Sequence, residues 1–386
     1  MELEAWHLLI LPLFFALGWA AARVDIRHVM NESRAVPRSY FKGLNYLLNE
    51  QPDKAIEAFL EVAKMDPDTL ELHFALGALF RRRGELDRAI RIHQNLVDKP
   101  DLAQDARTKA LYELGQDFLK AGLLDRAEVV FRRLETGTQA LDALRSLLEI
   151  QMLTKAWTAA IETAARLEKL GCPALDADVA HFHCELAAAA LLKGALKDAR
   201  SALDAALAQN RRAARAWMML GDLAAQQGQD QEAISQWRQL ETLNPTYLPL
   251  VAERLLQAHV RLGQTDAGLA LLRAYLERQA SDDLLHLLFQ AVAERKGWVE
   301  ARQLAAEALK RQPSLRVLDD YLQADNALQS GNDGDKIERQ LAQDLVHRQV
   351  SHDAGYACGH CGFKARQFFW QCPACARWET IGPERH

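Results

Sequence analysis

The sequence predicts an all-α protein in which paired helices form a long repeat array, preceded by one apolar helix and followed by a small metal-binding domain. Three observations support this prediction. The 386 residues are 49% apolar and 26% charged with only 11 prolines, a composition typical of helices. Small residues recur through the middle of the chain at intervals of 33 to 39 residues. Two Cys-x-x-Cys pairs lie near the C-terminus, beginning at Cys358 and Cys372.

The N-terminal stretch from Ala5 to Ala22 has no charged residue if His7 is taken as neutral. As a helix it would span about 27 Å, close to the roughly 30 Å core of a bilayer. A cleaved signal peptide begins with basic residues, whereas this chain begins with two glutamates. Basic residues come afterwards, at positions 23, 27, 34, 38 and 42. We therefore predict a transmembrane anchor (1–23), a basic juxtamembrane segment (24–35) and a cytoplasmic remainder. A cleaved signal and a buried helix are the alternatives.

The middle of the chain repeats a pattern in which, in five of the copies, a glycine precedes a small residue by five positions. The small residues stand at 55, 89, 127, 160, 199, 233, 268 and 301. Their spacing matches the two-helix tetratricopeptide repeat with two short insertions. A glycine or alanine often lies twelve positions before the small residue, and a large apolar residue four positions after it. Small residues let facing helices approach, and large ones fill the space between helix pairs.

We therefore predict about eight repeats over residues 36–313, forming a superhelix. The fourth (about 142–169) and the seventh (about 247–277) fit the pattern poorly. Residues 314–350 are predicted to form one more helix pair, which caps the array and carries the metal domain. Because no long linker rich in Pro, Ser or Gly follows this pair, we expect the metal domain to dock on the array.

The C-terminal segment, residues 351–386, contains four cysteines at a spacing typical of a metal site. They are Cys358, Cys361, Cys372 and Cys375. Two Cys-x-x-Cys turns can direct four thiolates at one ion, and nearby glycines suit turns whose N–H groups donate to sulfur. The segment is too short to fold on an apolar core alone, so one metal ion per chain is expected to stabilise it. Zinc is favoured and iron is the alternative. Two disulfides are disfavoured by the cytoplasmic placement.

Five aromatic residues of this segment are predicted to form its small core rather than a platform for stacking bases. They are Phe363, Phe368, Phe369, Trp370 and Trp378. The net charge of −5 and the pI near 6.2 give no general attraction for nucleic acid. Motifs of metalloproteases, phosphate-binding loops and serine hydrolases are absent from the sequence, so no enzymatic activity is predicted.

Other residues of chemical interest are given structural roles. His181 and His183 are two positions apart, so on a helix they point in different directions and cannot share a metal ion. Cys172 and Cys184 are expected to behave as small buried residues. Arg81 begins a run of three arginines at the end of a predicted helix. Such a run usually forms a solvated face or complements the helix dipole, although it can also hold an acidic partner.

The combination of anchor, array and four-cysteine ribbon resembles the lipopolysaccharide assembly protein B (LapB/YciM) family of Gram-negative bacteria over the whole chain. The more specific stretches are 40–45, 48–55, 87–94, 180–182, 184–187 and 358–378. The resemblance implies a non-enzymatic inner-membrane adaptor that helps the membrane-anchored AAA+ protease FtsH to degrade the deacetylase LpxC. It also implies contacts with other inner-membrane proteins of the lipopolysaccharide pathway and metal binding by the four ribbon cysteines. The N-terminus would then be periplasmic and the bulk of the chain cytoplasmic.

The repeat phase predicts a partner-binding surface on the first helices. Tyr40, Phe74, Arg81 and Tyr112 are expected to line the concave face of the array. Two alternatives to the adaptor role remain open. One is a general membrane-tethered scaffold for another envelope complex, and the other is a membrane-tethered, rubredoxin-like electron carrier. Homo-oligomerisation is a further possibility that the sequence does not decide.

Overall fold

The computed structural model describes residue 19 and residues 38–49, 51–65, 69–328, 333–353 and 355–384. The chain divides into two compact units, unit 1 up to Thr154 and unit 2 from Lys155 onward. The predicted membrane anchor and basic segment lie outside the described residues, except for Trp19. Within the described part of the chain, no helix is both long enough and apolar enough to cross a bilayer.

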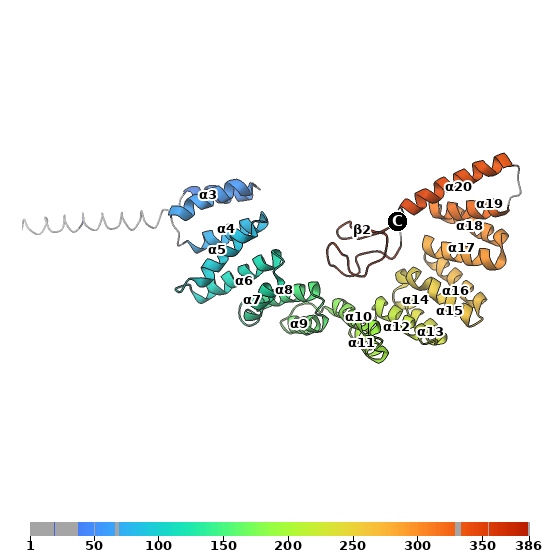
Figure 1. The fold of residues 1–386 in the computed structure, drawn as a ribbon, viewed down its shortest axis with the longest axis horizontal. Coiled ribbons are helices and arrows are strands. Elements are labelled where there is room, and N and C mark those ends of the chain that lie inside the picture. Colours follow the sequence, from blue (N-terminus) through green and yellow to red (C-terminus); the bar gives the residue numbers. More distant parts are fainter. Residues whose placement is uncertain are drawn as a thin grey trace, which may run out of the picture. The chain divides into compact units, whose positions relative to one another are not determined.

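Unit 1 is a stack of helices that pack in order along the chain, coloured blue to green in Figure 1. Its described helices are α2 (Arg38–Leu48), α3 (Pro52–Met65), α4 (Leu70–Arg82), α5 (Leu86–Asp98), α6 (Gln104–Lys120), α7 (Leu124–Arg133) and α8 (Ala140–Leu153). The first helices of successive pairs also touch, α4 with α6 and α6 with α8. This is the stacking that two-helix repeats need, because one pair alone cannot bury its apolar face.

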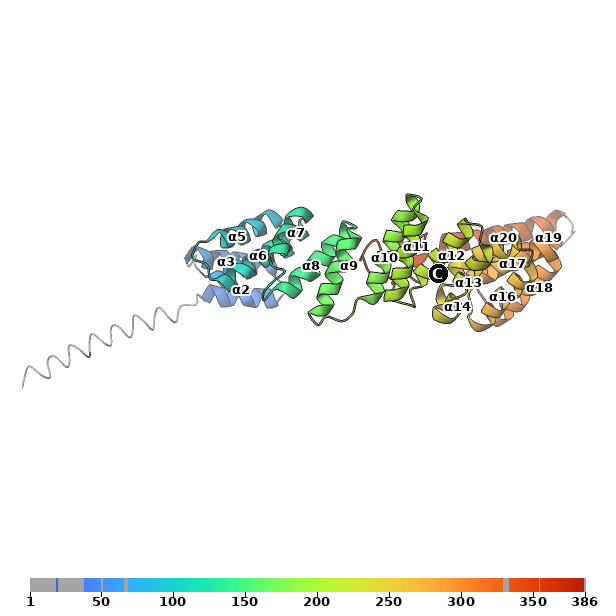
Figure 2. The same ribbon diagram turned by 90° about the horizontal axis from the view of Figure 1, so that it is seen from below.

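Unit 2 continues the same pattern and ends in the cysteine-rich segment. Its described helices are α9 (Trp157–Lys169), α10 (Asp176–Leu192), α11 (Leu196–Gln209), α12 (Ala214–Gln226), α13 (Asp230–Trp237), α14 (Leu240–Leu243), η1 (Pro245–Tyr247), α15 (Pro249–Arg261), α16 (Thr265–Arg278), α17 (Asp282–Lys296), α18 (Trp298–Arg311), α19 (Leu315–Leu328) and α20 (Asp333–Asp353). Pairs such as α10 with α11 and α12 with α13 lie side by side (Figure 2).

All eight small residues predicted from the repeat period lie on second helices and are buried. Opposite them, the glycines twelve positions earlier make room for one large side chain. A methyl group at Gly43 would lie 2.6 Å from the Phe59 ring, and one at Gly115 would lie 2.7 Å from Phe131. Gly221 and Trp237 form the same pair in the sixth repeat. In the eighth repeat the large and small residues exchange places. Phe289 lies on the first helix and Ala305 on the second, and both are buried.

The turn between the two helices of a repeat requires a left-handed backbone conformation. Glycines at 84, 122, 194, 228 and 263 supply it, with φ between 70° and 78°. The fourth repeat lacks this glycine, and Lys155 takes the conformation instead with φ of 56°. The helices α8 and α9 form in spite of this substitution. The weak pattern of the fourth repeat therefore reflects a changed turn residue rather than a missing element.

The seventh repeat begins irregularly, and this irregularity matters for the site. Helix α13 ends at Trp237, and the chain then makes α14 and η1 before α15 starts. Pro245 and Pro249 stand at the start of η1 and α15, where proline is favoured because no N–H is needed. The extra turn places Tyr247 beside the C-terminal segment.

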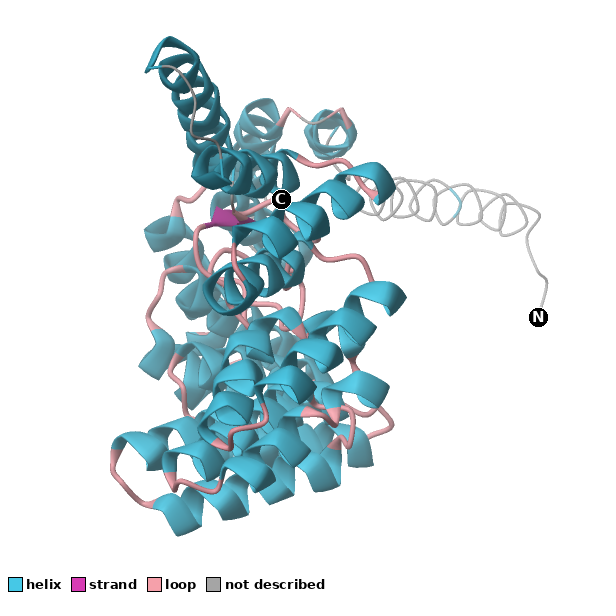
Figure 3. Ribbon diagram, turned by 90° about the vertical axis from the view of Figure 1, so that its right-hand side faces the viewer, coloured by secondary structure: helices cyan, strands magenta, loops and turns pink. Residues whose placement is uncertain are grey.

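Strand structure in the described residues is limited to one short hairpin of the C-terminal segment (Figure 3). Strand β1 (Tyr356–Ala357) pairs antiparallel with β2 (Lys364–Ala365). Isolated bridges join Cys358 to Ile381 and Gln371 to Trp378. These bridges hold the segment around its four cysteines.

Candidate metal centre and its docking surface

The four predicted cysteines meet at one point in space. Cys358 Sγ lies 3.9 Å from Cys375 Sγ, and Cys361 Sγ lies 3.7 Å from Cys372 Sγ. All four sulfurs lie within 4.8 Å of one another. Four sulfurs at about 2.3 Å from a central ion would be roughly 3.8 Å apart, whereas a disulfide requires about 2.0 Å. The spacing therefore suits one tetrahedral metal ion, and the cysteines are not paired as disulfides.

The two Cys-x-x-Cys turns have the same backbone hydrogen bonds. Cys358 N–H donates to Phe363 O at 2.8 Å, and Cys372 N–H donates to Arg377 O at 2.9 Å. A second bond closes each turn, from the residue after the second cysteine to the first cysteine's carbonyl. Gly362 supplies it in one turn and Ala376 in the other, both with positive φ. The two turns thus form a matched pair of ligand-bearing knuckles.

The surroundings of the sulfurs favour a bound cation. The Thr380 hydroxyl and the N–H groups of Cys361 and His360 lower the pKa of Cys358 to about 6, against the effect of burial. The Phe363 N–H acts in the same direction on Cys361, yet burial and the other three cysteine side chains raise its pKa to about 12. Four thiolates therefore repel one another unless a cation lies between them. The predicted N–H donors to sulfur are present in the first turn, at His360, Cys361 and Phe363.

The C-terminal segment docks on the array of unit 2, as the sequence predicted. Trp378 is the centre of this contact. Its ring stacks on His181 of α10, with centroids 4.6 Å apart and planes 7° from parallel. It meets the edges of Trp157 and Phe182 at 6.2 and 6.3 Å. Arg215 of α12 lies 5.9 Å from the ring centroid, within the range of a cation–π contact.

A polar contact fixes the orientation of His181 against the segment. His181 Nε2 lies 3.0 Å from Glu379 Oε1. His181 Nδ1 is buried and has no hydrogen-bond partner among the described residues. The ring proton is therefore placed on Nε2, which donates to Glu379. This histidine is structural, as predicted, but its role is to hold the C-terminal segment.

A second aromatic contact lies at η1. Tyr247 lies 5.0 Å from Trp370 and 6.4 Å from Phe368, measured between ring centroids. Burial, reinforced by Glu379, raises the pKa of Tyr247 to about 12. The tyrosine is therefore neutral in the folded protein.

The predicted aromatic core of the C-terminal segment needs a correction. Phe363, Phe368 and Phe369 pack around the buried cysteines and Ile381. The two tryptophans face the array: Trp370 packs against the main core of unit 2 as well as on Phe368, and Trp378 packs against His181. Sequence reasoning missed this division because a tryptophan in a short segment gives no sign of which surface it covers.

The predicted partner-binding residues lie in unit 1, and two of them are half-buried beside charged neighbours. Phe74 has Lys109 at 4.6 Å from its ring centroid. Tyr112 packs edge-on against Phe131, and burial raises its pKa. Tyr40 belongs to α2, but its side chain lies outside the described residues. These placements leave the partner role of the three residues a prediction.

Arg81, the fourth predicted partner residue, is engaged within the chain. Its guanidinium contacts Asp117 Oδ1 at 2.7 Å and Glu113 Oε2 at 2.6 Å, both on α6. The other oxygen of Asp117 lies 2.5 Å from His93 Nδ1, and both of these side chains are fully buried. These contacts raise the pKa of Arg81 against the desolvation that would lower it. Arg81 thus belongs to a polar network that links two repeats.

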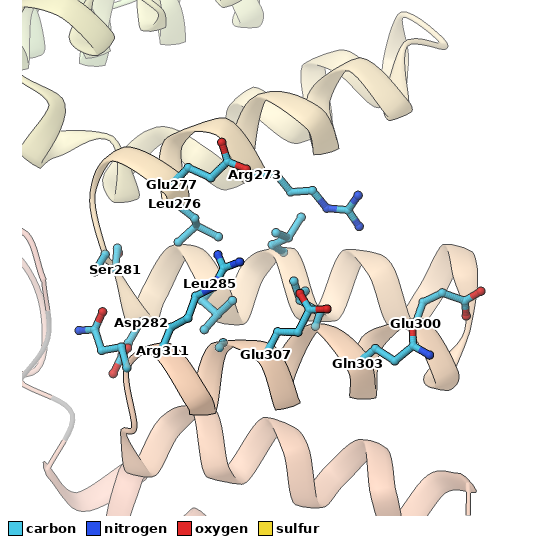
Figure 4. A pocket seen from close by; sticks show the side chains of 15 residues that line it. Arg273, Leu276, Glu277, Ser281, Asp282, Leu285, Glu300, Gln303, Glu307 and Arg311 are labelled. Atoms are coloured by element: carbon cyan, nitrogen blue, oxygen red, sulfur yellow. The ribbon is translucent and has the colours of Figure 1, made fainter.

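A pocket of about 440 Å³ lies apart from the cysteines, between α16, α17 and α18. Figure 4 shows Arg311 and Glu307 pointing from α18 toward α16, above a floor that includes Leu285. Glu277 and Arg273 of α16 stand on the other side. The lining mixes both signs of charge, with four acidic residues and two arginines, and it points to no single class of ligand.

Comparison with known families agrees with this geometry. Residues 356–383 match the family model described as a rubredoxin metal binding domain. Residues 42–101 and 184–245 match the tetratricopeptide repeat model. A tetratricopeptide repeat protein from Parabacteroides merdae aligns with a TM-score of 0.35 at 12% identity, over 74% of this chain and 96% of that chain. The fold and the site define a helical tetratricopeptide repeat protein with a C-terminal rubredoxin-type metal-binding domain, called the ribbon below.

Relatives match over nearly the full length. Lipopolysaccharide assembly protein B of Escherichia coli (strain K12) is 34% identical over 380 residues, covering 98% of this chain and 97% of the relative. The protein of the same name from Haemophilus influenzae is 30% identical over 387 residues, covering 97% of each. The chain belongs to the lipopolysaccharide assembly protein B family.

Proposed function

We propose that this chain is a non-enzymatic adaptor of the inner membrane that regulates lipopolysaccharide synthesis by promoting the proteolysis of LpxC by FtsH. The observation that supports this most is the match to relatives named lipopolysaccharide assembly protein B over 98% of the chain. A tetratricopeptide array is a binding scaffold in form, since it offers a long stacked surface to a protein partner.

The proposed position of the chain follows from its N-terminal sequence. The uncharged stretch from Ala5 to Ala22 and the basic residues after it favour one membrane span with a periplasmic N-terminus. Such an anchor would keep the array close to a membrane protease and raise its effective concentration there. Protease protection of tags at the two ends of the chain, in spheroplasts, tests this topology. Digestion of a C-terminal tag from outside would contradict it.

The proposed metal ion is zinc, held by Cys358, Cys361, Cys372 and Cys375. Bound there, it would cross-link the two knuckles through coordination bonds in a segment with only a small core. Iron would fit the same four thiolates and would support the electron-carrier alternative. The colour of the purified protein separates the two, because an oxidised iron–thiolate site is red and a zinc site is colourless.

The adaptor role is tested by reconstitution. Purified FtsH and LpxC are combined in proteoliposomes with ATP, with and without the full chain, and LpxC is followed over time. We expect LpxC to disappear several-fold faster when the chain is present. In cells, depletion of the chain should raise the level of LpxC. An unchanged degradation rate together with an unchanged LpxC level would favour a general scaffold for another envelope complex.

A further inference from the structure

One loop of the ribbon serves both the metal centre and the docking contact. We call residues 376–381 the docking loop. Gly359 N–H donates to Thr380 O at 2.7 Å, and the Thr380 hydroxyl lies 3.3 Å from Cys358 Sγ. On the other knuckle, Cys372 N–H donates to Arg377 O at 2.9 Å. Between Arg377 and Thr380 the loop carries Trp378 and Glu379, both of which contact His181. The shape of the docking loop therefore depends on both cysteine knuckles.

On the array side of this contact, Trp157, Phe182 and Arg215 are held by contacts within the array. We call Trp157, His181, Phe182 and Arg215 the aromatic socket. Phe182 is fully buried and stacks on Trp157 at 5.5 Å. Arg215 is held by an ion pair with Glu185, 2.7 Å long. Because these contacts are all within the helices α9, α10 and α12, the aromatic socket should keep its shape when the ribbon leaves it.

The array and the ribbon are stabilised by different interactions. The array is stabilised by the stacked cores of its repeats, whereas the ribbon has only a small core around its cysteines. Segments of this size usually unfold when their metal is removed. Loss of cysteine ligation would then free the docking loop and uncover the aromatic socket. The uncovered surface would offer a slot for an indole between His181, Trp157 and Arg215, with the His181 Nε2–H ready to donate to a carboxylate.

We propose that the ribbon is a metal-dependent gate on this socket. The folded ribbon fills the aromatic socket within the chain. The unfolded ribbon opens it to a segment of a protein partner in which a tryptophan is followed by an acidic residue. This inference rests on the adaptor role proposed above, because it describes how one partner site of the adaptor would be regulated.

The test uses the purified full chain and a labelled peptide. The peptide has the sequence of residues 375–382 with serine in place of Cys375, and its binding is followed by fluorescence anisotropy. Three forms are compared: the metal-loaded natural chain, the Cys372→Ser chain, which lacks one ligand, and the Trp378→Ala chain, which leaves the four cysteines intact. Metal content of each form is measured in parallel. Concentrations up to about 1 mM are needed, since a tethered loop competes at an effective concentration in that range.

We expect the Cys372→Ser and Trp378→Ala chains to bind the peptide at least ten-fold more tightly than the loaded natural chain. Adding Arg215→Ala to the Trp378→Ala chain should abolish the binding, and so should replacing the peptide's tryptophan by alanine. Equal binding to all three forms, or no binding to the open forms, would overturn the gate. If Trp378→Ala loses its metal, Glu379→Gln serves as the second variant, with intermediate affinity expected. None of these measurements involves FtsH or LpxC, so the gate and the adaptor role can fail separately.

Discussion

The imidazole of His181 lies parallel to the indole of Trp378, with 4.6 Å between ring centroids, while its Nε2 contacts Glu379 at 3.0 Å. One buried side chain thus makes both a stacking contact and a polar contact between the ribbon and the array. His183, two positions further along α10, is half-buried, and burial lowers its pKa. The two histidines therefore form a natural pair of test and control positions.

We expect His181→Ala to weaken the docking of the ribbon on the array and to lower the stability of unit 2 by about 2 kcal/mol, through lost stacking and an unpaired Glu379. Hydrogen exchange of the ribbon amides, measured by mass spectrometry, should become faster while the helices of unit 1 stay unchanged. His183→Ala should leave the exchange of the ribbon as it is. Equal exchange in the two variants would mean that His181 does not hold the ribbon.

Lys155 is expected to be a weak point of the fourth repeat. Its φ of 56° is one that glycine adopts without strain and that other residues adopt at a cost of about 1 to 2 kcal/mol. Glycine also gains freedom in the unfolded chain, which offsets part of this difference. We expect Lys155→Gly to stabilise the protein by about 0.5 to 1 kcal/mol and to raise its thermal midpoint. Lys193→Gly is the control, because Lys193 has φ of −86° and the same change should be destabilising there.

Most of the helical array could be predicted from the sequence because its packing uses a fixed period. A small residue at Ala89 or Ala233 must recur wherever two helices approach closely, so the period shows in the sequence. The repeats that matched poorly depart from the pattern in local ways. In the fourth repeat Lys155 replaces a turn glycine, and the seventh begins after the irregular α14 and η1. The eighth repeat, which kept its phase, exchanges the large and small positions in Phe289 and Ala305. Such exchanges keep the total volume and hide the repeat from a search for fixed residue types.

The metal site could be predicted from the sequence, whereas the residues of the docking contact could not. The cysteine spacing alone brings Cys358, Cys361, Cys372 and Cys375 together, because each pair sits on a local turn. The docking contact joins His181 to residues far along the chain, and no local pattern encodes such a pairing. The available signal was a set of aromatic residues too large for the core of so short a segment. The engagement of Arg81 by Glu113 and Asp117 was missed for the same reason.

In the sixth repeat, the energetic effects of substitutions at Gly221 and Trp237 should depend strongly on each other. A methyl group at Gly221 would collide with the Trp237 ring, which is fully buried and donates from Nε1 to Met218 O at 3.1 Å. We expect Gly221→Ala to cost about 2 kcal/mol of unfolding free energy. In a Trp237→Leu background the same change should cost less by 1 kcal/mol or more. The fifth repeat already uses that combination, with Ala187 and Leu203 in one buried cluster. Additive effects in the double-mutant cycle would contradict this account.

Arg81 should be essential to the stability of unit 1. Arg81→Met would remove the arginine from Asp117, whose side chain is fully buried, and leave the contact with His93. Removing one partner of a buried ion pair costs about 3 to 5 kcal/mol, and the 20% exposure of the Arg81 side chain reduces this to about 2 to 3. Arg82→Met, at an exposed neighbour, should change stability by less than about 0.5 kcal/mol. Urea unfolding of both variants measures the difference, and it must precede any use of Arg81 to map a partner surface.

The cysteines should fall into distinct classes of reactivity. Burial raises the pKa of Cys184 to about 12, so its thiol stays protonated at pH 8 and should not react with iodoacetamide in the folded chain. We expect the purified chain to contain about one metal ion, with the four ribbon thiols unreactive while the ion is bound. Chelation should make those four thiols reactive, while Cys184 should stay unreactive until the array is denatured. Mass spectrometry of the alkylated peptides distinguishes the classes. Reaction of Cys184 together with the ribbon thiols would show that the array opens when the metal is lost, and the aromatic socket would then lack the independent stability that the gate requires.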